Sequence, residues 1–366
     1  MISIKEVTTK REIRQFIRYP KRLYKHCPYY VPPLDADEYK MITAHPAKSF
    51  CEIRLWLAYK DDKIAGRIGG IINHRYNELK NKRRIRFGWF DVDDDIEIAR
   101  ALLQTVEKWG EEKQLLEISG PSRYSNMEKQ GMLVEGFDVV STISCDYNYP
   151  YYTVFMDNLG YEKEEDYLQF KTEIKEIPNK IKDLSHLIAQ RYKVSMKEFK
   201  DKKELLKYAK RFFYALNESF IRVYNFIPLM DDEIEYLIKN NFSIADKNLI
   251  GIIVDESDHV VGFSFSVPSL SKAFQKAQGK LFPWGWYHIL KALKKNDTID
   301  LYLTGVLPQW RGISALYHYQ LHKTYVEKGF KYGITNQQLE SNQSYRVWEK
   351  YGAKRITKRR CYLKKL

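Results

Sequence analysis

Residues 306–316 have the composition of an anion-binding turn between a strand and a helix. The preceding residues, 300–306, alternate as a strand does, and the apolar positions that follow have helical spacing. The turn itself contains Gln309, Trp310, Arg311, Gly312 and Ser314. A helix N-terminus presents unpaired N–H groups and the positive end of the helix dipole, Gly312 admits close approach, and Arg311 adds charge. The sequence predicts a phosphate site here, with an ordinary turn carrying a solvated arginine as the alternative.

The chain contains two similar halves. Residues 3–12 recur as residues 195–204, and the hairpin of residues 55–66, which turns on acidic residues, recurs at residues 250–262. Each half continues with a strand and an amphipathic helix, then ends in an aromatic helix and a further strand. The order of these blocks indicates a duplication.

We therefore expect two domains, residues 1–177 and 178–366, joined where the polar stretch around Pro178 lacks periodicity. The two halves differ at the turn. After the strand at residues 85–90, the first half has Asp91, Asp93, Asp94 and Asp95. These carboxylates suit the start of a helix but repel a diphosphate. A phosphorylated cofactor should therefore bind the second half.

Composition limits the class of protein. The chain has 366 residues, a formal net charge of +14 and four widely spaced cysteines, with no CxxC pair. Its eight histidines show no ligand spacing, so we expect no metal site. No apolar run approaches the roughly 20 residues that span a bilayer, and the N-terminus does not resemble a secretory signal. These features favour a cytoplasmic protein with polyanionic partners.

The order of elements, with Gln309-x-x-Gly312-x-Ser314 before a helix and Asn342 followed by Gly352, resembles the GNAT (Gcn5-related N-acetyltransferase) superfamily. The family loop is Gln/Arg-x-x-Gly-x-Gly/Ala, so Ser314 is an imperfect match. Residues 120–137 and 147–152 resemble a bacterial GNAT-like group without an assigned substrate. The resemblance implies an α/β (α+β) fold with two tandem GNAT-like domains, each a mixed, mostly antiparallel twisted sheet flanked by helices.

The resemblance also implies the cofactor, acetyl-CoA or another acyl-CoA, held between splayed strands at residues 300–306 and 332–336. The backbone near Val306 would polarise the thioester carbonyl. The cofactor-binding residues expected by resemblance are Val306, Gln309, Trp310, Arg311, Gly312, Ile313, Ser314 and Asn342.

Acyl transfer to an amine needs a proton acceptor and a donor for the thiolate. Glu340 is the candidate base, although a solvated or helix-capping glutamate is the alternative. Tyr345 and Tyr351 are the candidate donors, with packing as the alternative. Trp348 stands where many family members have the acid tyrosine, and an indole N–H is not a useful general acid.

A substrate site is expected in the cleft between the halves, for a small-molecule or peptide amine. The candidate residues are Asn126, Glu128, Tyr151, Tyr152 and Asn225. A hydrogen-bonded structural loop explains residues 125–128 equally well.

Two basic segments need separate explanations. Residues 269–295 contain Trp284 and Trp286 among six lysines, which suits a lid packed on the domain or a contact with a membrane surface or nucleic acid. Residues 354–365 are basic around an expected strand, which we assign to a solvated sheet edge.

The leading functional prediction is an acyl-CoA-dependent N-acyltransferase. One alternative is a non-catalytic GNAT-fold binding or sensory protein, favoured by Trp348. Another is a protein like the aminoacyl-tRNA-dependent ligases, since the net charge suits nucleic acid. We do not favour that alternative because the sequence shows no long helical hairpin arm.

Overall fold

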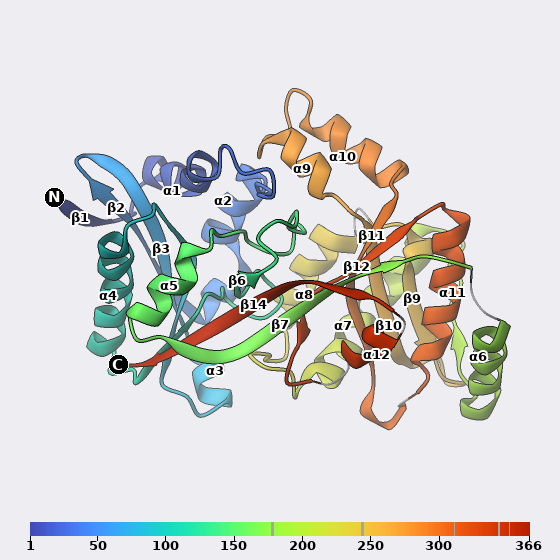
Figure 1. Ribbon diagram of the computed structural model, residues 1–366. Coiled ribbons are helices and arrows are strands. Elements are labelled where there is room, and N and C mark those ends of the chain that lie inside the picture. Colours follow the sequence, from blue (N-terminus) through green and yellow to red (C-terminus); the bar gives the residue numbers. More distant parts are fainter. Residues whose placement is uncertain (177–178, 243–244, 311, 343–344, 351) are drawn as a thin grey trace.

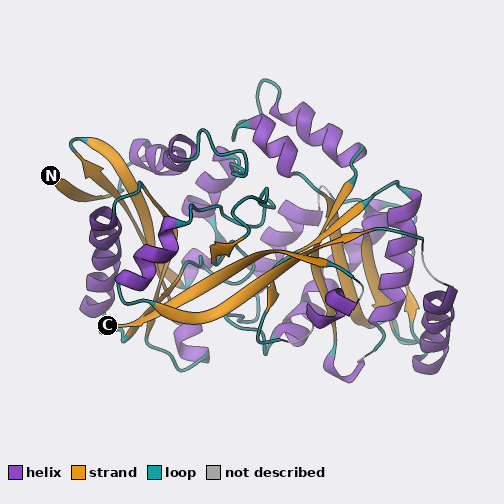
Figure 2. Ribbon diagram, in the orientation of Figure 1, coloured by secondary structure: helices purple, strands orange, loops and turns teal. Residues whose placement is uncertain are grey.

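The computed structural model describes residues 1–176, 179–242, 245–310, 312–342, 345–350 and 352–366. Within these residues the strands form one twisted mixed sheet, with helices packed along it (Figures 1 and 2). The main path of the sheet runs β1-β2-β3-β4-β5-β14-β7-β12-β11-β10-β9-β8, while β6 pairs with β14 and β13 pairs with β7.

The strands of the described residues have the following bounds: β1 Ile2–Glu6, β2 Cys51–Lys60, β3 Lys63–Asn73, β4 Arg84–Val92, β5 Glu117–Gly120, β6 Met132–Glu135, β7 Glu162–Glu173, β8 Ser195–Met196, β9 Ile250–Val254, β10 Val260–Pro268, β11 Thr298–Val306, β12 Tyr332–Thr335, β13 Gln338–Leu339 and β14 Lys354–Lys365.

The α-helices have the following bounds: α1 Lys10–Leu23, α2 Asp35–Ala44, α3 His74–Leu79, α4 Ile96–Glu112, α5 Tyr151–Asn158, α6 Asn179–Tyr192, α7 Lys202–Phe220, α8 Asp231–Leu237, α9 Ser271–Ala277, α10 Gly285–Lys294, α11 Ser314–Glu327 and α12 Arg346–Lys350.

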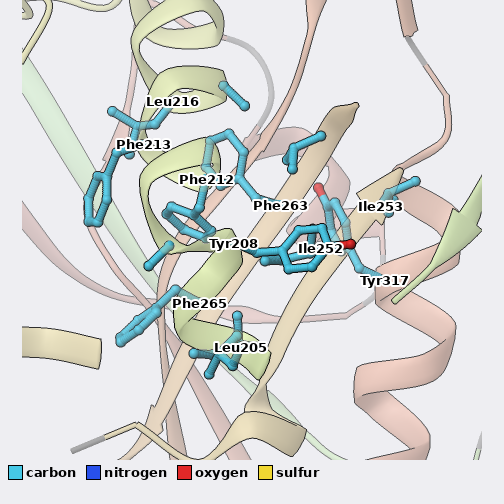
Figure 3. Close-up of a cluster of buried hydrophobic side chains, with 14 of the residues drawn as sticks. Leu205, Tyr208, Phe212, Phe213, Leu216, Ile252, Ile253, Phe263, Phe265 and Tyr317 are labelled. Atoms are coloured by element: carbon cyan, nitrogen blue, oxygen red, sulfur yellow. The ribbon is translucent and has the colours of Figure 1, made fainter. Parts of the chain in front are cut away.

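Both halves build their core from the same pairing of sheet and helix. In the first half, α4 buries Ile98, Leu102, Val106 and Trp109 against the sheet, at the three- and four-residue spacing of one helix face. In the second half, α7 does the same through residues that include Phe212, and Figure 3 shows these side chains packed against β9 and β10. The repeated order of elements confirms the internal similarity that the sequence predicts.

The acidic segment of the first half caps a helix, as expected. The Asp95 side chain accepts a hydrogen bond from the Glu97 N–H at the start of α4 and pairs with Lys60 at 2.7 Å. Asp93 accepts a hydrogen bond from the Tyr19 hydroxyl at 2.7 Å. These carboxylates therefore have structural partners.

The C-terminal strand belongs to the interior of the sheet. β14 pairs with β5 on one side and with β7 on the other, and both are strands of the first half (Figure 1). Arg359 and Cys361 on β14 are fully buried. The prediction that residues 354–365 form a solvated edge was wrong, because alternate residues of a central strand must face a covered side of the sheet.

Strands β7 and β14 also join the two halves. β7 continues past β14 to pair with β12 of the second half, so the ladder crosses from one half to the other without a break. Residues 177–178, at the predicted division between domains, lie outside the described residues. The division into residues 1–177 and 178–366 stays a prediction, to which the structure adds that β14 lies among the strands of the first half.

Candidate functional site

The parallel strands β11 and β12 separate partway along their length. Their ladder runs from Thr298 and Tyr332 to Leu301 and Thr335, and the Asn336 N–H then donates to the Leu301 carbonyl at 2.8 Å. Beyond this point β11 continues to Val306 with hydrogen bonds to β10 alone among the described strands. The edge of residues 303–306 that faces away from β10 is therefore open to pair with a ligand backbone.

A large cavity of about 1230 Å³ lies beside this opening. One wall comes from the second half, including Thr304, Gly305 and Val306 of β11 and Phe212 of α7. The opposite wall comes from the first half and includes Met41 of α2. The cavity exceeds the roughly 300–1,000 Å³ of ordinary small-molecule pockets.

The N-terminus of α11 reaches the same cavity. Gly312 and Ser314 line it, and no side chain of a described residue forms a capping hydrogen bond to the helix, whose N-cap residue is Ile313. Gly312 has φ of +98°, and a Cβ placed there would meet no atom within 4 Å. An uncapped helix end beside a glycine in the left-handed region leaves backbone N–H groups accessible to an anion.

The predicted cofactor residues divide into two groups. Val306, Gly312, Ser314 and Asn342 line the cavity. Gln309 is exposed outside the lining, Trp310 packs beside Tyr192, and the Ile313 side chain is fully buried in the core. Arg311 lies outside the described residues. The backbone of the turn thus reaches the cavity, while the side chains of Gln309, Trp310 and Ile313 do not line it.

The corresponding opening in the first half is mostly occupied by protein and keeps a cavity of only about 30 Å³, lined by residues that include Gly88, Ser122 and Tyr152. Strands β4 and β5 also pair in parallel over a short stretch, from Arg84 to Arg86. Beyond it, a Cβ added to Gly88 would lie 2.6 Å from the Ser122 carbonyl oxygen. The Tyr152 hydroxyl accepts the Val92 N–H at 2.7 Å and lies 3.0 Å from the Tyr24 hydroxyl. This half therefore retains the strand arrangement with far less space than the second half offers.

Two of the five predicted substrate residues line the large cavity, Asn126 and Glu128. Glu128 is held by the backbone N–H and hydroxyl of Ser125 and lies 3.4 Å from the His45 Nε2 atom. Although burial acts to raise it, the pKa of Glu128 is lowered by the hydrogen bonds from His45 and Ser125. His45 Nδ1 accepts the Ala47 N–H, so both ring nitrogens of His45 have a partner. His45 and Glu128 therefore line the cavity as a hydrogen-bonded pair.

The other three predicted substrate residues do not reach the cavity. Tyr152 is fully buried, and the Tyr151 hydroxyl donates to the Val92 carbonyl at 2.7 Å. Asn225 is buried with φ of +59° and is absent from the lining. The two tyrosines pack in the first half and Asn225 has a left-handed backbone conformation, so the cavity lining does not support these three assignments, which stay predictions.

Glu340 is poorly placed for a base. Its carboxylate accepts hydrogen bonds from Lys163 at 2.9 Å and from Lys358 at 3.0 Å, and it is absent from the cavity lining. The hydrogen bond from Lys163, followed by that from Lys358, lowers the pKa of Glu340 despite some burial. Its carboxylate is already held by two cations and lies outside the cavity lining, so the geometry does not support Glu340 as the base, and the assignment stays a prediction.

The roles of the two predicted donor tyrosines stay predictions. Tyr345 stacks on Phe170 with ring centroids 6.1 Å apart and does not line the cavity. Tyr351 lies outside the described residues. Trp348 does line the cavity, on α12.

His318 is a cavity residue to which the sequence analysis gave no role in the site. It follows Ser314 by one turn of α11 and lies against Trp348, with ring centroids 6.1 Å apart. The His318 side chain is exposed and lines the cavity, and the protein that surrounds the cavity desolvates the ring in part. This desolvation lowers the pKa of His318 to about 4. Its position four residues after Ser314, on the same helix face, was the available signal.

Asp300 and Tyr302 were also missed. They lie two residues apart on β11, at an irregularity of its ladder with β10, and Tyr302 lines the cavity. Both Asp300 carboxylate oxygens and the Tyr302 hydroxyl are buried without a well-formed hydrogen bond. Burial raises the pKa of Asp300 to about 7, and the Ser269 side chain only partly offsets this effect. A carboxyl group within an apolar strand was the available signal.

The described residues contain no group of three or more His, Cys, Asp or Glu side chains arranged to hold a metal ion. Among the helices that the structure describes, none combines the length and apolar character needed to cross a bilayer.

No family model matches the chain. Protein YghO of Escherichia coli is 25% identical over 325 residues, which cover 84% of this chain and 79% of the relative. A bacterial ceramide synthase of Caulobacter vibrioides is 25% identical over 304 residues, covering 80% of this chain and 77% of the relative.

A solved tandem GNAT protein from the clavulanic acid biosynthesis pathway aligns with a TM-score of 0.58 and 11% identity. The alignment covers 100% of this chain and 98% of that protein. The chain therefore has a tandem GNAT fold, the fold of the Gcn5-related N-acetyltransferase superfamily.

Proposed function

We propose that the protein is an N-acyltransferase that uses an acyl-CoA bound by its second half. The observation that carries the proposal is the continuous cavity that joins the opened edge of β11 to the uncapped N-terminus of α11. An acyl-CoA supplies the thioester whose acyl carbon passes to an amine nitrogen as its bond to sulfur breaks.

The residues of the second half fit such a cofactor. The diphosphate would lie at the N-H groups of Gly312 and Ser314, where the helix dipole favours negative charge. The edge of residues 303–306 offers backbone groups to the amides of the pantetheine arm. A backbone N–H near Val306 would polarise the thioester carbonyl. The first half offers far less open space and carries carboxylates at the same position.

The size and lining of the cavity support a substrate with a long hydrocarbon chain. Its apolar lining includes Met41, Phe212, Phe265, Val267 and Leu270. A cavity of about 1230 Å³ accommodates a pantetheine arm together with an alkyl chain. The relative named bacterial ceramide synthase supports the same class, since a ceramide is the amide of a long-chain amino alcohol and a fatty acid. We therefore propose a long-chain amine, a long-chain acyl group, or both.

His318 is the proposed proton acceptor for the amine. It lines the cavity and has no hydrogen bond to a described residue, whereas Glu340 and His45 are both engaged elsewhere. With a pKa of about 4, the imidazole is neutral near pH 7 and has a free lone pair. The Tyr302 hydroxyl, which has no hydrogen-bond partner among the described residues, is the other proton-carrying group that we expect near the reacting atoms.

Isothermal titration with CoA, acetyl-CoA and palmitoyl-CoA tests the cofactor, and release of free thiol in the presence of amines tests the reaction. We expect palmitoyl-CoA to bind more tightly than acetyl-CoA, and a long-chain amino alcohol to be acylated faster than short amines. Absence of binding at millimolar concentrations of all three ligands would remove the proposal.

If the protein binds one of these CoA ligands but releases no thiol with any amine tested, a non-catalytic GNAT-fold binding protein would be favoured instead. The observation behind this second candidate is that Trp348, which cannot act as an acid, lines the cavity. Salt-dependent retention of tRNA would favour the ligase-like alternative.

A further inference from the structure

The segment between β10 and β11 forms a helical hairpin with a strongly basic surface. The hairpin consists of α9, the connecting residues 278–284, and α10, and it projects from the body of the molecule (Figure 1). Residues 269–295 contain six lysines and no aspartate or glutamate. All six side chains are exposed, and none forms an ion pair with a described residue. The lysines are Lys272, Lys276, Lys280, Lys291, Lys294 and Lys295.

The end of the hairpin also exposes large apolar side chains. Phe282 is 77% exposed and Trp284 is 67% exposed, the largest values among the aromatic residues that the structure describes as exposed. Leu281, Trp286, Tyr287 and Leu290 are exposed beside them. The Trp286 indole N–H donates to the Pro283 carbonyl at 2.8 Å, so the hairpin satisfies this polar group itself. So many apolar groups at one projecting end mark an interaction surface.

The hairpin is fixed to the body on its other side. The Gln275 side chain on α9 donates to the carbonyls of Pro28 and Tyr30 in the first half, and the Asp35 N–H donates to the Gly279 carbonyl. Leu281 and Ile289 contribute to the wall of the large cavity. The apolar end is therefore held in a set orientation beside the cavity.

We propose that this hairpin binds the surface of an anionic lipid bilayer. Phe282, Trp284 and Leu290 insert among the lipid headgroups and upper acyl chains, and the lysines lie against the lipid phosphates. Aromatic and aliphatic side chains flanked by lysines, without acidic residues, match the chemistry of this interface. A projecting end suits a bilayer better than a single strand of nucleic acid, which binds along grooves.

The orientation has a consequence for the proposed acyl transfer, and this consequence rests on that function. With Leu281 in both the exposed end and the cavity wall, a long-chain substrate dissolved in the bilayer would lie close to the cavity. Membrane binding itself is measured without any turnover, so failure of one proposal is distinguishable from failure of the other.

Co-sedimentation of the full chain tests the proposal, using vesicles of phosphatidylcholine alone and vesicles that also contain phosphatidylglycerol. We expect binding to the anionic vesicles that weakens as salt is added, and little binding to the neutral ones. The double variant Phe282→Ser/Trp284→Ser should bind at least about tenfold more weakly, because it removes the inserting side chains. The triple variant Lys291→Gln/Lys294→Gln/Lys295→Gln should bind more weakly and with less dependence on salt.

Matched controls separate the hairpin from the rest of the surface. Val154→Ser removes an apolar side chain that is 55% exposed on α5, and Lys108→Gln removes an exposed lysine on α4. Both should bind vesicles as the unaltered protein does, and thermal unfolding should show that all variants are folded. The proposal is overturned if the anionic vesicles do not retain the protein at low salt, or if the double variant binds as well as Val154→Ser. The proposal is also overturned if RNA displaces the protein from the vesicles as effectively as other vesicles do. It is likewise overturned if the unaltered protein self-associates without binding vesicles and the double variant does not self-associate.

Discussion

His318 and Trp348 meet edge to face at the wall of the cavity, with their ring centroids 6.1 Å apart and an interplanar angle of 82°. The contact brings together α11, which begins at the proposed diphosphate site, and α12, which carries the tryptophan that replaces the expected acid tyrosine. An imidazole thus lies beside this tryptophan and gives the cavity a group able to accept a proton, whereas the tyrosine would have donated one.

Replacing His318 tests this role. We expect His318→Gln to lower kcat for acyl transfer by about 10²-fold, the usual contribution of a positioned general base. The KM for acyl-CoA should change little, because the ring does not contribute to the helix N-terminus. His322→Gln is the matched control: it changes a histidine one turn further along α11, whose Nε2 contacts the Lys175 carbonyl. Equal kcat values in the two variants would exclude His318.

The pH dependence offers a separate test of His318. Because the protein lowers the pKa of His318 to about 4, the imidazole becomes protonated, and unable to accept a proton, only below that value. On the acid side of the pH profile, kcat should therefore decrease near pH 4, well below the usual histidine pKa of about 6.5. A pH profile measured over the range in which the protein stays folded should stay flat near pH 6.5. A limb near that value that disappears in His318→Gln would contradict the expected pKa.

Charge at the start of α11 should control the affinity for acyl-CoA. Ser314→Glu places a carboxylate where the helix dipole favours it, so we expect the fold to be retained. The same carboxylate would repel the diphosphate, and we expect the Kd for CoA to rise at least about tenfold. Ser314→Gln, of similar size and without charge, should change Kd by less than about threefold. Titration calorimetry measures both, and equal Kd values would place the diphosphate elsewhere.

Asp300 should make the free energy of unfolding depend on pH. Its folded pKa is raised to about 7, so between about pH 4 and 7 the folded state retains a proton that the unfolded state has released. Stability should fall as the pH rises through this window and then level off. Asp300→Asn stays neutral throughout, so its stability relative to the unaltered protein should be similar near pH 4 and higher near pH 8, by on the order of 4 kcal/mol.

Denaturant unfolding of both proteins at each pH measures this difference. Asp297→Asn, on an exposed aspartate three residues earlier, is the control and should show no such trend. A stability difference for Asp300→Asn that is the same at both pH values would show that the Asp300 carboxyl does not titrate as expected.

Asp166 should stabilise the contact between β7 and β14. Its fully buried carboxylate pairs with Arg360 at 2.8 Å, Lys358 at 2.9 Å and Lys163 at 3.0 Å. Burial alone would raise the pKa of Asp166, but the hydrogen bonds from Arg360, Lys358 and Lys163 outweigh it and lower the pKa. Its contribution to stability is therefore present above pH 4 and is lost as the pH falls further. We expect Asp166→Asn to cost about 3 kcal/mol near pH 7.

Glu340→Gln is the matched variant, since Glu340 binds Lys163 and Lys358 at the surface. We expect it to cost less than about 1 kcal/mol and to retain acyl transfer. Thermal unfolding and the thiol-release assay measure both properties. A loss of kcat in Glu340→Gln as large as in His318→Gln would restore Glu340 as the base.

The sequence by itself determined the doubled architecture and the turn at which the anion site is proposed. Apolar spacing in α4 and α7, the hairpins that turn on acidic residues, and the glycine at position 312 depend on local periodicity and backbone freedom. Asp95 places a carboxylate at the start of a helix in the first half, and Ser314 places an uncharged side chain at the start of a helix in the second, as predicted. This difference in charge is also a local property of the sequence.

Tertiary structure alone decided which side chains meet at the cavity. Glu340 is neutralised by lysines from β7 and β14, which are 177 and 18 residues away in the chain. Tyr152 fills the first half, and β14 becomes an inner strand because its partners β5 and β7 come from that half. Such pairings join strands that are far apart in the chain, and local sequence patterns do not determine which distant strands pair.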